Sequence, residues 1–286
     1  MQDVKVAAVQ IYGRPCKPKK NLERMEDFMK KGSRLGVDAM CFPEFVISGF
    51  DYGEKLRPVY LASEPVPEGP STQRLIELAR KYNLTVVAGI SEKGEGELRF
   101  NTCVIVGPDG YVGKYRKVHM NSERWLYCES SSFPVFDSPH GCLGVSICFD
   151  NTFSECARIL ALRGAEILFA PHCFGNLHAG KSTPRAQAAA VRQFRTEGVM
   201  KFMQARANDN NMFAVFSNMV GGPHRYIGAS CILSPRGDLI ARCDAWREDM
   251  CVAELKAADL AAARAAQTCS LKRRRASIYS DLVRLT

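Results

Sequence analysis

The stretch Gly144-Val145-Ser146-Ile147-Cys148-Phe149-Asp150 is an apolar run that ends in a thiol and then a carboxylate. Such a run predicts a buried strand. Open α/β sheets hold their active sites beyond the carboxyl ends of their strands. The stretch therefore predicts an α/β sheet in which one strand delivers Cys148 to such an end.

Two other strand-like runs also end in a charged side chain. Val37 to Phe42 is followed by Pro43 and Glu44, and a third run ends in Tyr115-Arg116-Lys117-Val118-His119. A nucleophile, a base and a cation at strand ends are the groups that amide-bond chemistry through a covalent thioester requires. Each residue alone has an ordinary explanation, because a lone cysteine in a strand is usually core and the two charged residues would usually be solvated.

These segments share their order and spacing with a known family. They are Pro43-Glu44 followed by Ser48-Gly49-Phe50, then Tyr115-Arg116-Lys117-Val118-His119, then Cys148-Phe149-Asp150 leading to Glu155 and Arg158. The chain therefore resembles the carbon–nitrogen hydrolase (nitrilase) superfamily, from about Val4 to about Leu255. Three motifs in family order make the separate ordinary explanations improbable when taken together.

Strand-like and helix-like segments alternate along the chain, which predicts an α/β fold. The expected strands are Val4 to Gln10, Val37 to Phe42, Leu84 to Ile90, Phe100 to Val106, Tyr111 to Lys117, Cys142 to Cys148, Ile167 to Ala170, Met212 to Ser217, Ala229 to Leu233, Leu239 to Arg242 and Met250 to Glu254. The expected helices are Asn21 to Leu35, Thr72 to Tyr82, Phe153 to Arg163 and Arg185 to Asn208. The resemblance implies a four-layer αββα sandwich of two mixed sheets covered by helices. No linker divides the chain, so residues 1–286 are expected to form one domain, with 256–286 as a C-terminal arm.

The catalytic roles follow from the chemistry and from the resemblance. Cys148 would be the nucleophile, and Glu44 would be the base that activates its thiol. Lys117 would favour the thiolate or donate to the oxyanion, with the backbone N–H of Phe149 as a second donor. The resemblance implies Glu123 as a fourth member, because the family has a second glutamate shortly after the lysine motif. Ser130 stands where the family usually has a glycine.

Four residues near the nucleophile are expected to line a small polar and aromatic pocket: Phe149, Asn151, His172 and Phe174. For His172 two interpretations stay open, since it can line the pocket or simply pack there. Relatives that hydrolyse N-carbamoyl D-amino acids carry an arginine pair three and four positions after the cysteine. Asn151 and Thr152 occupy those positions here. A bidentate carboxylate clamp is therefore missing at that place.

Composition excludes several classes of protein. No apolar run reaches the roughly 18 residues of a membrane span, and the N-terminus lacks a secretory signal, so a cytoplasmic protein is expected. The 12 cysteines include no Cys-x-x-Cys pair, which argues against a disulfide framework and against a zinc site. We expect neither a metal nor a cofactor.

The formal net charge of +9 has a local contribution from the basic run Lys272 to Arg275. Attraction to nucleic acid is one interpretation. A solvated tail, or a tail that docks on a partner subunit, is favoured instead, because no aromatic residues alternate with the basic ones to stack bases. The resemblance implies a homodimer or higher homo-oligomer, in which Ile278, Tyr279, Leu282 and Val283 would be buried against a neighbour.

The sequence therefore predicts a hydrolase of non-peptide carbon–nitrogen bonds that acts on a small amide or N-carbamoyl substrate through a cysteine thioester and releases ammonia. A nitrilase, which converts a nitrile to an acid and ammonia, is the alternative with the same chemistry. The alternative from another class is a catalytically inactive basic scaffold or nucleic-acid-binding protein. The presence of Glu44, Lys117 and Cys148 together argues against this last one, because an inactive protein would be free to lose them.

Overall fold

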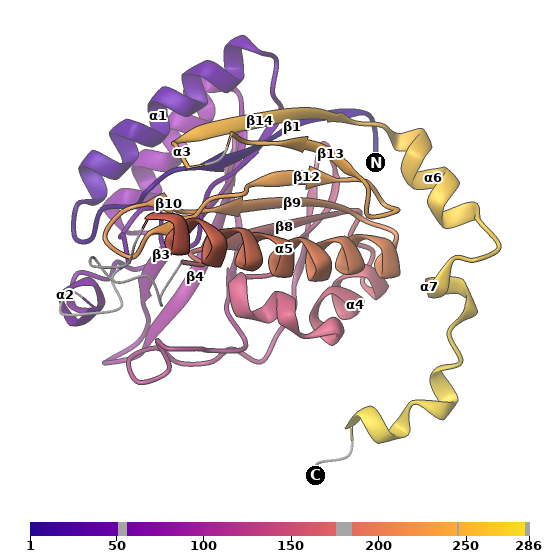
Figure 1. The fold of residues 1–286 in the computed structure, drawn as a ribbon. Helices are drawn as coiled ribbons and strands as arrows, with labels where there is room; N and C mark the ends of the chain where they lie inside the picture. Colours follow the sequence, from indigo (N-terminus) through magenta and orange to yellow (C-terminus); the bar gives the residue numbers. More distant parts are fainter. Residues whose placement is uncertain (51–55, 176–184, 245, 284–286) are drawn as a thin grey trace.

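Two six-stranded sheets pack face to face, and helices cover their outer faces (Figure 1). The computed structural model describes residues 1–50, 56–175, 185–244 and 246–283. The predicted four-layer αββα sandwich is confirmed. In the described part of the chain, no helix combines the length and the hydropathy that crossing a bilayer requires.

The first sheet contains strands from both the beginning and the end of the chain. Its strand order is β14 (Asp249–Leu255), β1 (Val4–Gln10), β2 (Ala39–Cys41), β3 (Thr85–Lys93), β4 (Arg99–Gly107) and β5 (Gly110–Arg116). The neighbours β1, β2 and β3 run parallel, whereas β14, β4 and β5 are joined by antiparallel pairing. Because β5 is antiparallel to β4 and β4 is antiparallel to β3, β5 runs in the same direction as β2 and β3.

The second sheet repeats this arrangement. Its order is β13 (Leu239–Arg242), β12 (Cys231–Leu233), β9 (Phe213–Asn218), β8 (Ile167–His172), β7 (Gly141–Val145) and β6 (Val135–Ser138). The strands β7, β8 and β9 are parallel, and the outer strands pair antiparallel. A short separate ribbon is formed by β10 (Val220–Gly221) and β11 (Tyr226–Ile227). Each sheet therefore has three parallel strands whose carboxyl ends lie at one edge.

Three apolar layers hold the sandwich together. Between the sheets lie buried side chains from both, among them Val87, Ile105, Val145 and Phe169. On the first sheet, α1 (Pro18–Arg34) and α3 (Pro70–Tyr82) bury apolar faces against the strands. On the second sheet, α4 (Ser154–Leu162) and α5 (Arg185–Asn210) do the same. These alternating apolar faces explain why helix-period and strand-period patterns alternate in the sequence.

The ends of the helices follow local chemistry. Both α1 and α3 begin with a proline, whose missing N–H costs nothing in the first turn. The helix α3 ends at Asn83, which adopts a left-handed conformation with φ of 53°. A short helix, α2 (Leu56–Leu61), lies between the first sheet's β2 and α3 in the chain.

The predicted arm has two parts. Its first part, α6 (Ala257–Ala265), contacts the body of the protein through the buried residues Leu260 and Ala263. The rest comprises α7 (Ser270–Arg273) and two 3-10 turns, η2 (Ala276–Ile278) and η3 (Ser280–Val283). Figure 1 shows this yellow segment running away from the sheets. Ile278, Leu282 and Val283 are exposed there.

The structure differs from the sequence predictions mainly at short elements. The strand expected to reach Cys148 ends at Val145, and Cys148 instead begins a 3-10 turn, η1 (Cys148–Thr152). The expected strand Val37 to Phe42 is only Ala39–Cys41. The strands β6, β10 and β11 were not predicted, because two to four residues are too few to show a period.

Candidate active site

The three predicted catalytic residues follow the carboxyl ends of three strands. Glu44 comes after β2, Lys117 after β5 and Cys148 after β7. Two hydrogen bonds connect this edge of one sheet to the other: Cys173 N–H donates to Glu44 Oε2 at 2.9 Å, and Ser217 Oγ donates to the Cys41 carbonyl at 2.8 Å. The face-to-face packing therefore brings residues from both sheets to one place.

Glu44 lies in a tight turn that needs close backbone approach. The next residue, Phe45, is left-handed with φ of 54°. On the neighbouring strand, Gly89 N–H donates to the Pro43 carbonyl, and Ile47 N–H donates to the Gly89 carbonyl. A Cβ on Gly89 would lie 2.2 Å from the Phe45 nitrogen, so no larger residue fits there. The absence of a side chain on Gly89 thus permits the buried position of Glu44.

Lys117 lies between two carboxylates. Its Nζ is 2.9 Å from Glu44 Oε1 and 2.5 Å from Glu123 Oε1. Asn101 Nδ2 donates to the same two oxygens, at 2.7 Å and 3.3 Å. All three charged side chains are at most 4% exposed. We call Glu44, Lys117 and Glu123 the inner charge cluster.

Mutual attraction keeps Lys117 and Glu44 charged despite burial. Burial alone would lower the pKa of Lys117, but the Glu44 and Glu123 carboxylates outweigh it and raise that pKa well above its usual range. Burial alone would raise the pKa of Glu44, but Lys117 and the hydrogen bonds from Cys173 and Asn101 outweigh it and lower that pKa. An ammonium ion and a carboxylate that can accept a proton are therefore present together at neutral pH.

Cys148 has an unusual backbone conformation. It is the first residue of η1, and its φ is 48°, in the left-handed region that a residue with a Cβ rarely adopts. The side chain is partly exposed and interacts electrostatically with Lys117. A strained turn thus places the thiol next to the inner charge cluster, where a substrate can reach it.

A second cysteine lies beside Cys148. Cys173 is buried, and both burial and its hydrogen bond with the Cys148 side chain raise its pKa well above the usual range. It therefore stays a neutral thiol, while its backbone N–H holds Glu44. Nothing in the sequence separates Cys173 from the other cysteines. The contacts of Asn101 with the two carboxylates were likewise not predicted.

Two of the four predicted pocket residues are partly exposed. Phe149 lies edge-on to Phe153, with ring centroids 5.3 Å apart. Phe174 is fixed by Asn218, whose Oδ1 accepts its N–H at 2.8 Å, and the Arg195 guanidinium lies over its ring. Both aromatic rings lie on segments next to the nucleophile, so their predicted contact with substrate is compatible with the fold.

The other two predicted pocket residues, Asn151 and His172, are buried. Asn151 Nδ2 donates to the Ser146 carbonyl at 2.8 Å. The His172 ring packs against Phe202 of α5 and Phe216 of β9, and burial lowers its pKa to about 4. His172 is therefore uncharged, and its ring lies between Phe216 of β9 and Phe202 of α5. A role for either residue in substrate binding stays a prediction.

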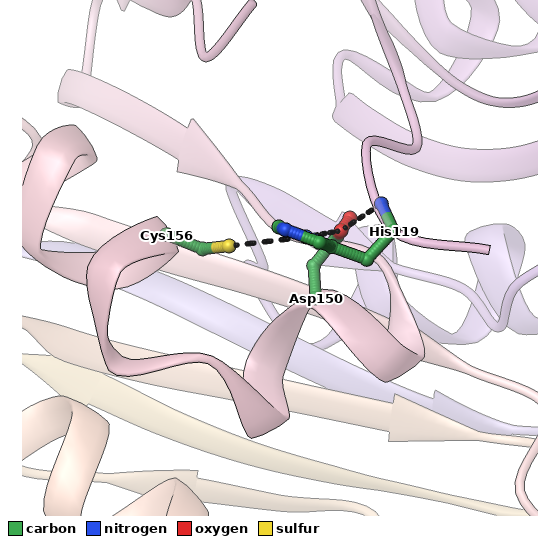
Figure 2. Close-up of side chains that lie close together, drawn as sticks. All are labelled: His119, Asp150 and Cys156. Carbon is green, nitrogen blue, oxygen red and sulfur yellow. Dashed lines mark hydrogen bonds and ion pairs between the residues drawn. The ribbon is translucent and has the colours of Figure 1, made fainter. Parts of the chain in front are cut away.

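One group of potential metal ligands occurs among the described residues: His119, Asp150 and Cys156 (Figure 2). Their ligand atoms lie within 4.8 Å of one another. The chemistry does not favour a metal, because burial raises the pKa of the Cys156 thiol to about 12 and metals bind the thiolate. Both Asp150 oxygens already accept hydrogen bonds from the protein.

Comparisons with known proteins identify the family of this chain. Residues 5–265 match the family model described as carbon-nitrogen hydrolase. A protein of Pyrococcus abyssi named nitrilase is 33% identical over 88% of this chain and 89% of its own. The human omega-amidase NIT2 is 31% identical over 78% of each chain.

A solved structure supports the fold. It is an amidase from Nesterenkonia sp. AN1, which matches with a TM-score of 0.79 at 20% identity over 98% of this chain and 100% of the other. That structure shows the Michael addition of acrylamide at its active-site cysteine. By its family match and by its relatives, this chain belongs to the carbon-nitrogen hydrolase family of the nitrilase superfamily.

Proposed function

We propose that this protein hydrolyses the non-peptide carbon–nitrogen bond of a small amide or N-carbamoyl compound through a thioester on Cys148. The observation that carries the proposal is the inner charge cluster, in which one buried ammonium group lies between two buried carboxylates beside a partly exposed thiol. Fully buried charges of this kind are costly and concentrate at functional sites.

The first half of the reaction acylates the enzyme. Glu44 takes the proton of the Cys148 thiol, and the sulfur attacks the substrate carbonyl carbon. Lys117 and the Phe149 N–H stabilise the oxyanion that forms. When the tetrahedral intermediate collapses, the C–N bond breaks, and Glu44 returns the proton to the departing nitrogen, which leaves as ammonia.

The second half releases the acid. Glu44 deprotonates a water molecule, which attacks the thioester carbonyl. The C–S bond then breaks, and Glu44 returns the proton to the sulfur to restore the Cys148 thiol. Glu123 does not transfer a proton in this scheme. Its contact with Lys117 at 2.5 Å keeps that side chain charged and in place through both halves.

An amide substrate is favoured over a nitrile by two of the relatives, which are named omega-amidase and amidase. The relative named nitrilase supports the second candidate, since a nitrile reaches the same thioester after addition of the sulfur and hydrolysis. An N-carbamoyl amino acid would need a carboxylate clamp. Of the arginines on α5, Arg192 donates to the Ile227 carbonyl and Arg195 to the Gly175 carbonyl, so both are already engaged.

The direct test is ammonia release from a panel of small amides, N-carbamoyl compounds and nitriles, with Cys148→Ala as the matched control. We expect release from at least one amide or N-carbamoyl compound, and none above background from the control. Release from nitriles alone would replace the proposal with the nitrilase alternative. No release from any class would favour the inactive scaffold.

A further inference from the structure

A single buried carboxylate connects the lysine segment to the nucleophile turn. Asp150 is fully buried and lies two residues after Cys148. Its Oδ1 accepts hydrogen bonds from the backbone N–H and the ring Nδ1 of His119, at 2.8 Å and 2.9 Å. Its Oδ2 accepts from the Tyr115 hydroxyl at 2.8 Å and from the Ile147 N–H at 3.3 Å. Figure 2 shows Asp150 and Cys156 both directed at the ring of His119.

The donors to Asp150 flank Lys117 and directly precede Cys148. Tyr115 and His119 are the second residues before and after Lys117, and Ile147 directly precedes Cys148. The Tyr115 hydroxyl is a reliable donor, because burial and the nearby Asp150 charge raise its pKa well above the usual range. The carboxylate therefore connects the segment that carries the oxyanion donor to the turn that carries the nucleophile.

The conformation of Cys148 explains why such a connection is needed. A non-glycine residue with φ of 48° costs free energy and persists only where its surroundings fix it. Asp150 closes the turn in both directions, since its N–H donates to the Ile147 carbonyl at 3.0 Å and its Oδ2 accepts from the Ile147 N–H. Hydrogen bonds to a charged acceptor are stronger than neutral ones, which suits this task.

His119 makes a further contact between the two segments through its ring. Its ring stacks on Phe153 with centroids 4.0 Å apart and an interplanar angle of 17°. Because Phe153 follows η1 directly, this contact packs the segment around Lys117 against the turn that begins at Cys148. Cys156 contacts the same ring nitrogen at 3.6 Å but belongs to neither catalytic segment.

We propose that Asp150 is a positioning residue, whose buried carboxylate holds the strained Cys148 turn at a fixed place relative to Lys117 without touching the substrate. The inference rests on the proposed nucleophilic role of Cys148. It assigns Tyr115 and His119 to the same function, as the donors through which Asp150 acts.

The test compares Asp150→Asn with the wild type in two measurements. Asparagine keeps the shape but turns one carboxylate oxygen into an NH2 group, which then faces a donor whichever way the amide is oriented. We expect kcat to fall by about tenfold to a hundredfold, with KM changed by less than about threefold. The rate at which acrylamide alkylates Cys148, followed by peptide mass mapping, should fall in parallel, since it needs no knowledge of the substrate.

Tyr115→Phe and Cys156→Ala are the graded variant and the control. Tyr115→Phe removes one donor and keeps the carboxylate, so kcat and the alkylation rate should each fall by about threefold to tenfold. Cys156→Ala should leave both within about twofold of wild type. If Asp150→Asn folds and keeps both rates within twofold, the proposal is overturned. If that variant does not fold, unchanged rates in Tyr115→Phe overturn it. A wild-type protein whose Cys148 is not alkylated ahead of the other cysteines would instead contradict the proposed function.

Discussion

Two clusters of charged side chains contain neighbouring residues of the chain but differ in charge balance and in exposure. Alternate residues of β5 and its extension point to opposite faces. Lys117 points inward, to Glu44 and Glu123 in the inner charge cluster. Lys114 and Arg116 point the other way, to Glu92, at 2.6 Å and 2.7 Å. We call Glu92, Lys114 and Arg116 the outer charge cluster.

The two clusters have opposite balance and exposure. The outer cluster has two cations for one carboxylate, and the side chains of Lys114 and Arg116 are 28% and 31% exposed. Burial alone would raise the pKa of Glu92, but its partners outweigh it and lower that pKa. The inner cluster has two carboxylates for one cation and is almost dry. Where buried carboxylates outnumber the cations, one of them can take a proton in a reaction. A carboxylate that is balanced by partly exposed cations instead stabilises the fold.

The largest expected effect is a difference in activity between substitutions of Lys117 and of Lys114. Lys117→Ala should lower kcat/KM by about a hundredfold or more, because it removes a buried oxyanion donor. Glu44→Gln should do the same, because an amide cannot act as a base. Lys114→Ala, the same substitution on the same strand, should stay within about threefold of wild type. The measurement is the steady-state rate of ammonia release on the best substrate of the panel.

Folding measurements by circular dichroism must accompany these rates, so that loss of structure is not mistaken for loss of chemistry. If Lys114→Ala and Lys117→Ala both fold and lose activity to the same extent, the proposed difference between the two clusters is wrong. It is also wrong if folded Glu44→Gln keeps a near-wild-type rate.

The second effect is on stability and its pH dependence. The pKa of Glu44 is lowered, so its stabilising contribution is present above its unfolded pKa of 4.5 and is lost as the pH falls through the lower folded value. The pKa of Lys117 is raised, so its contribution is present below 10.5 and is lost as the pH rises through the higher folded value. Between about pH 5 and pH 10, Glu44→Gln should therefore cost a constant free energy of unfolding, about 3 kcal/mol.

Urea unfolding at several pH values checks this prediction. Below pH 4.5 the wild type and Glu44→Gln should converge, because the wild type loses the same interaction. Glu92→Gln at pH 7 should cost less, about 1 kcal/mol, since water screens its partly exposed partners. A larger loss from Glu92→Gln than from Glu44→Gln would reverse the proposed ranking of the clusters.

The smallest expected effect on the rate comes from the arm, which touches neither cluster. Ile278, Leu282 and Val283 are 56%, 68% and 82% exposed in the single chain. We expect the full-length protein to be at least a dimer, with these residues covered by a neighbour. Truncation after Thr268 should reduce the assembly and change kcat less than Lys117→Ala does. Light scattering decides both points: a monodisperse monomer of about 32 kDa would contradict the dimer, and an unchanged assembly after truncation would contradict the arm.

The sequence predicted that Glu44, Lys117 and Cys148 lie together, because each follows a strand-like run and the strand ends of such a fold meet at one edge. It also predicted the strands Phe100 to Val106 and Tyr111 to Lys117, which the structure confirms as the antiparallel neighbours β4 and β5. The partner subunit, the cytoplasmic location and the substrate-binding residues stay predictions.

The supporting contacts were not predictable, because they join residues far apart in the sequence. The Cys173 N–H reaches Glu44 across 129 positions, and Asn101 reaches it across 57. Asp150 was quoted only as part of a motif, since nothing local shows that its oxygens face Tyr115 and His119. Likewise, an apolar run does not reveal that its strand ends early and that Cys148 adopts a left-handed turn.

The most direct test of the central claim is the site of the covalent intermediate. Wild-type protein is mixed with the best substrate, quenched in acid within the first turnovers and digested for peptide mass mapping. We predict that the acyl group of the substrate is attached to Cys148, not to Cys173, and that Cys148→Ala shows neither the adduct nor ammonia release. An acyl group on another residue, or wild-type turnover in Cys148→Ala, would contradict the account.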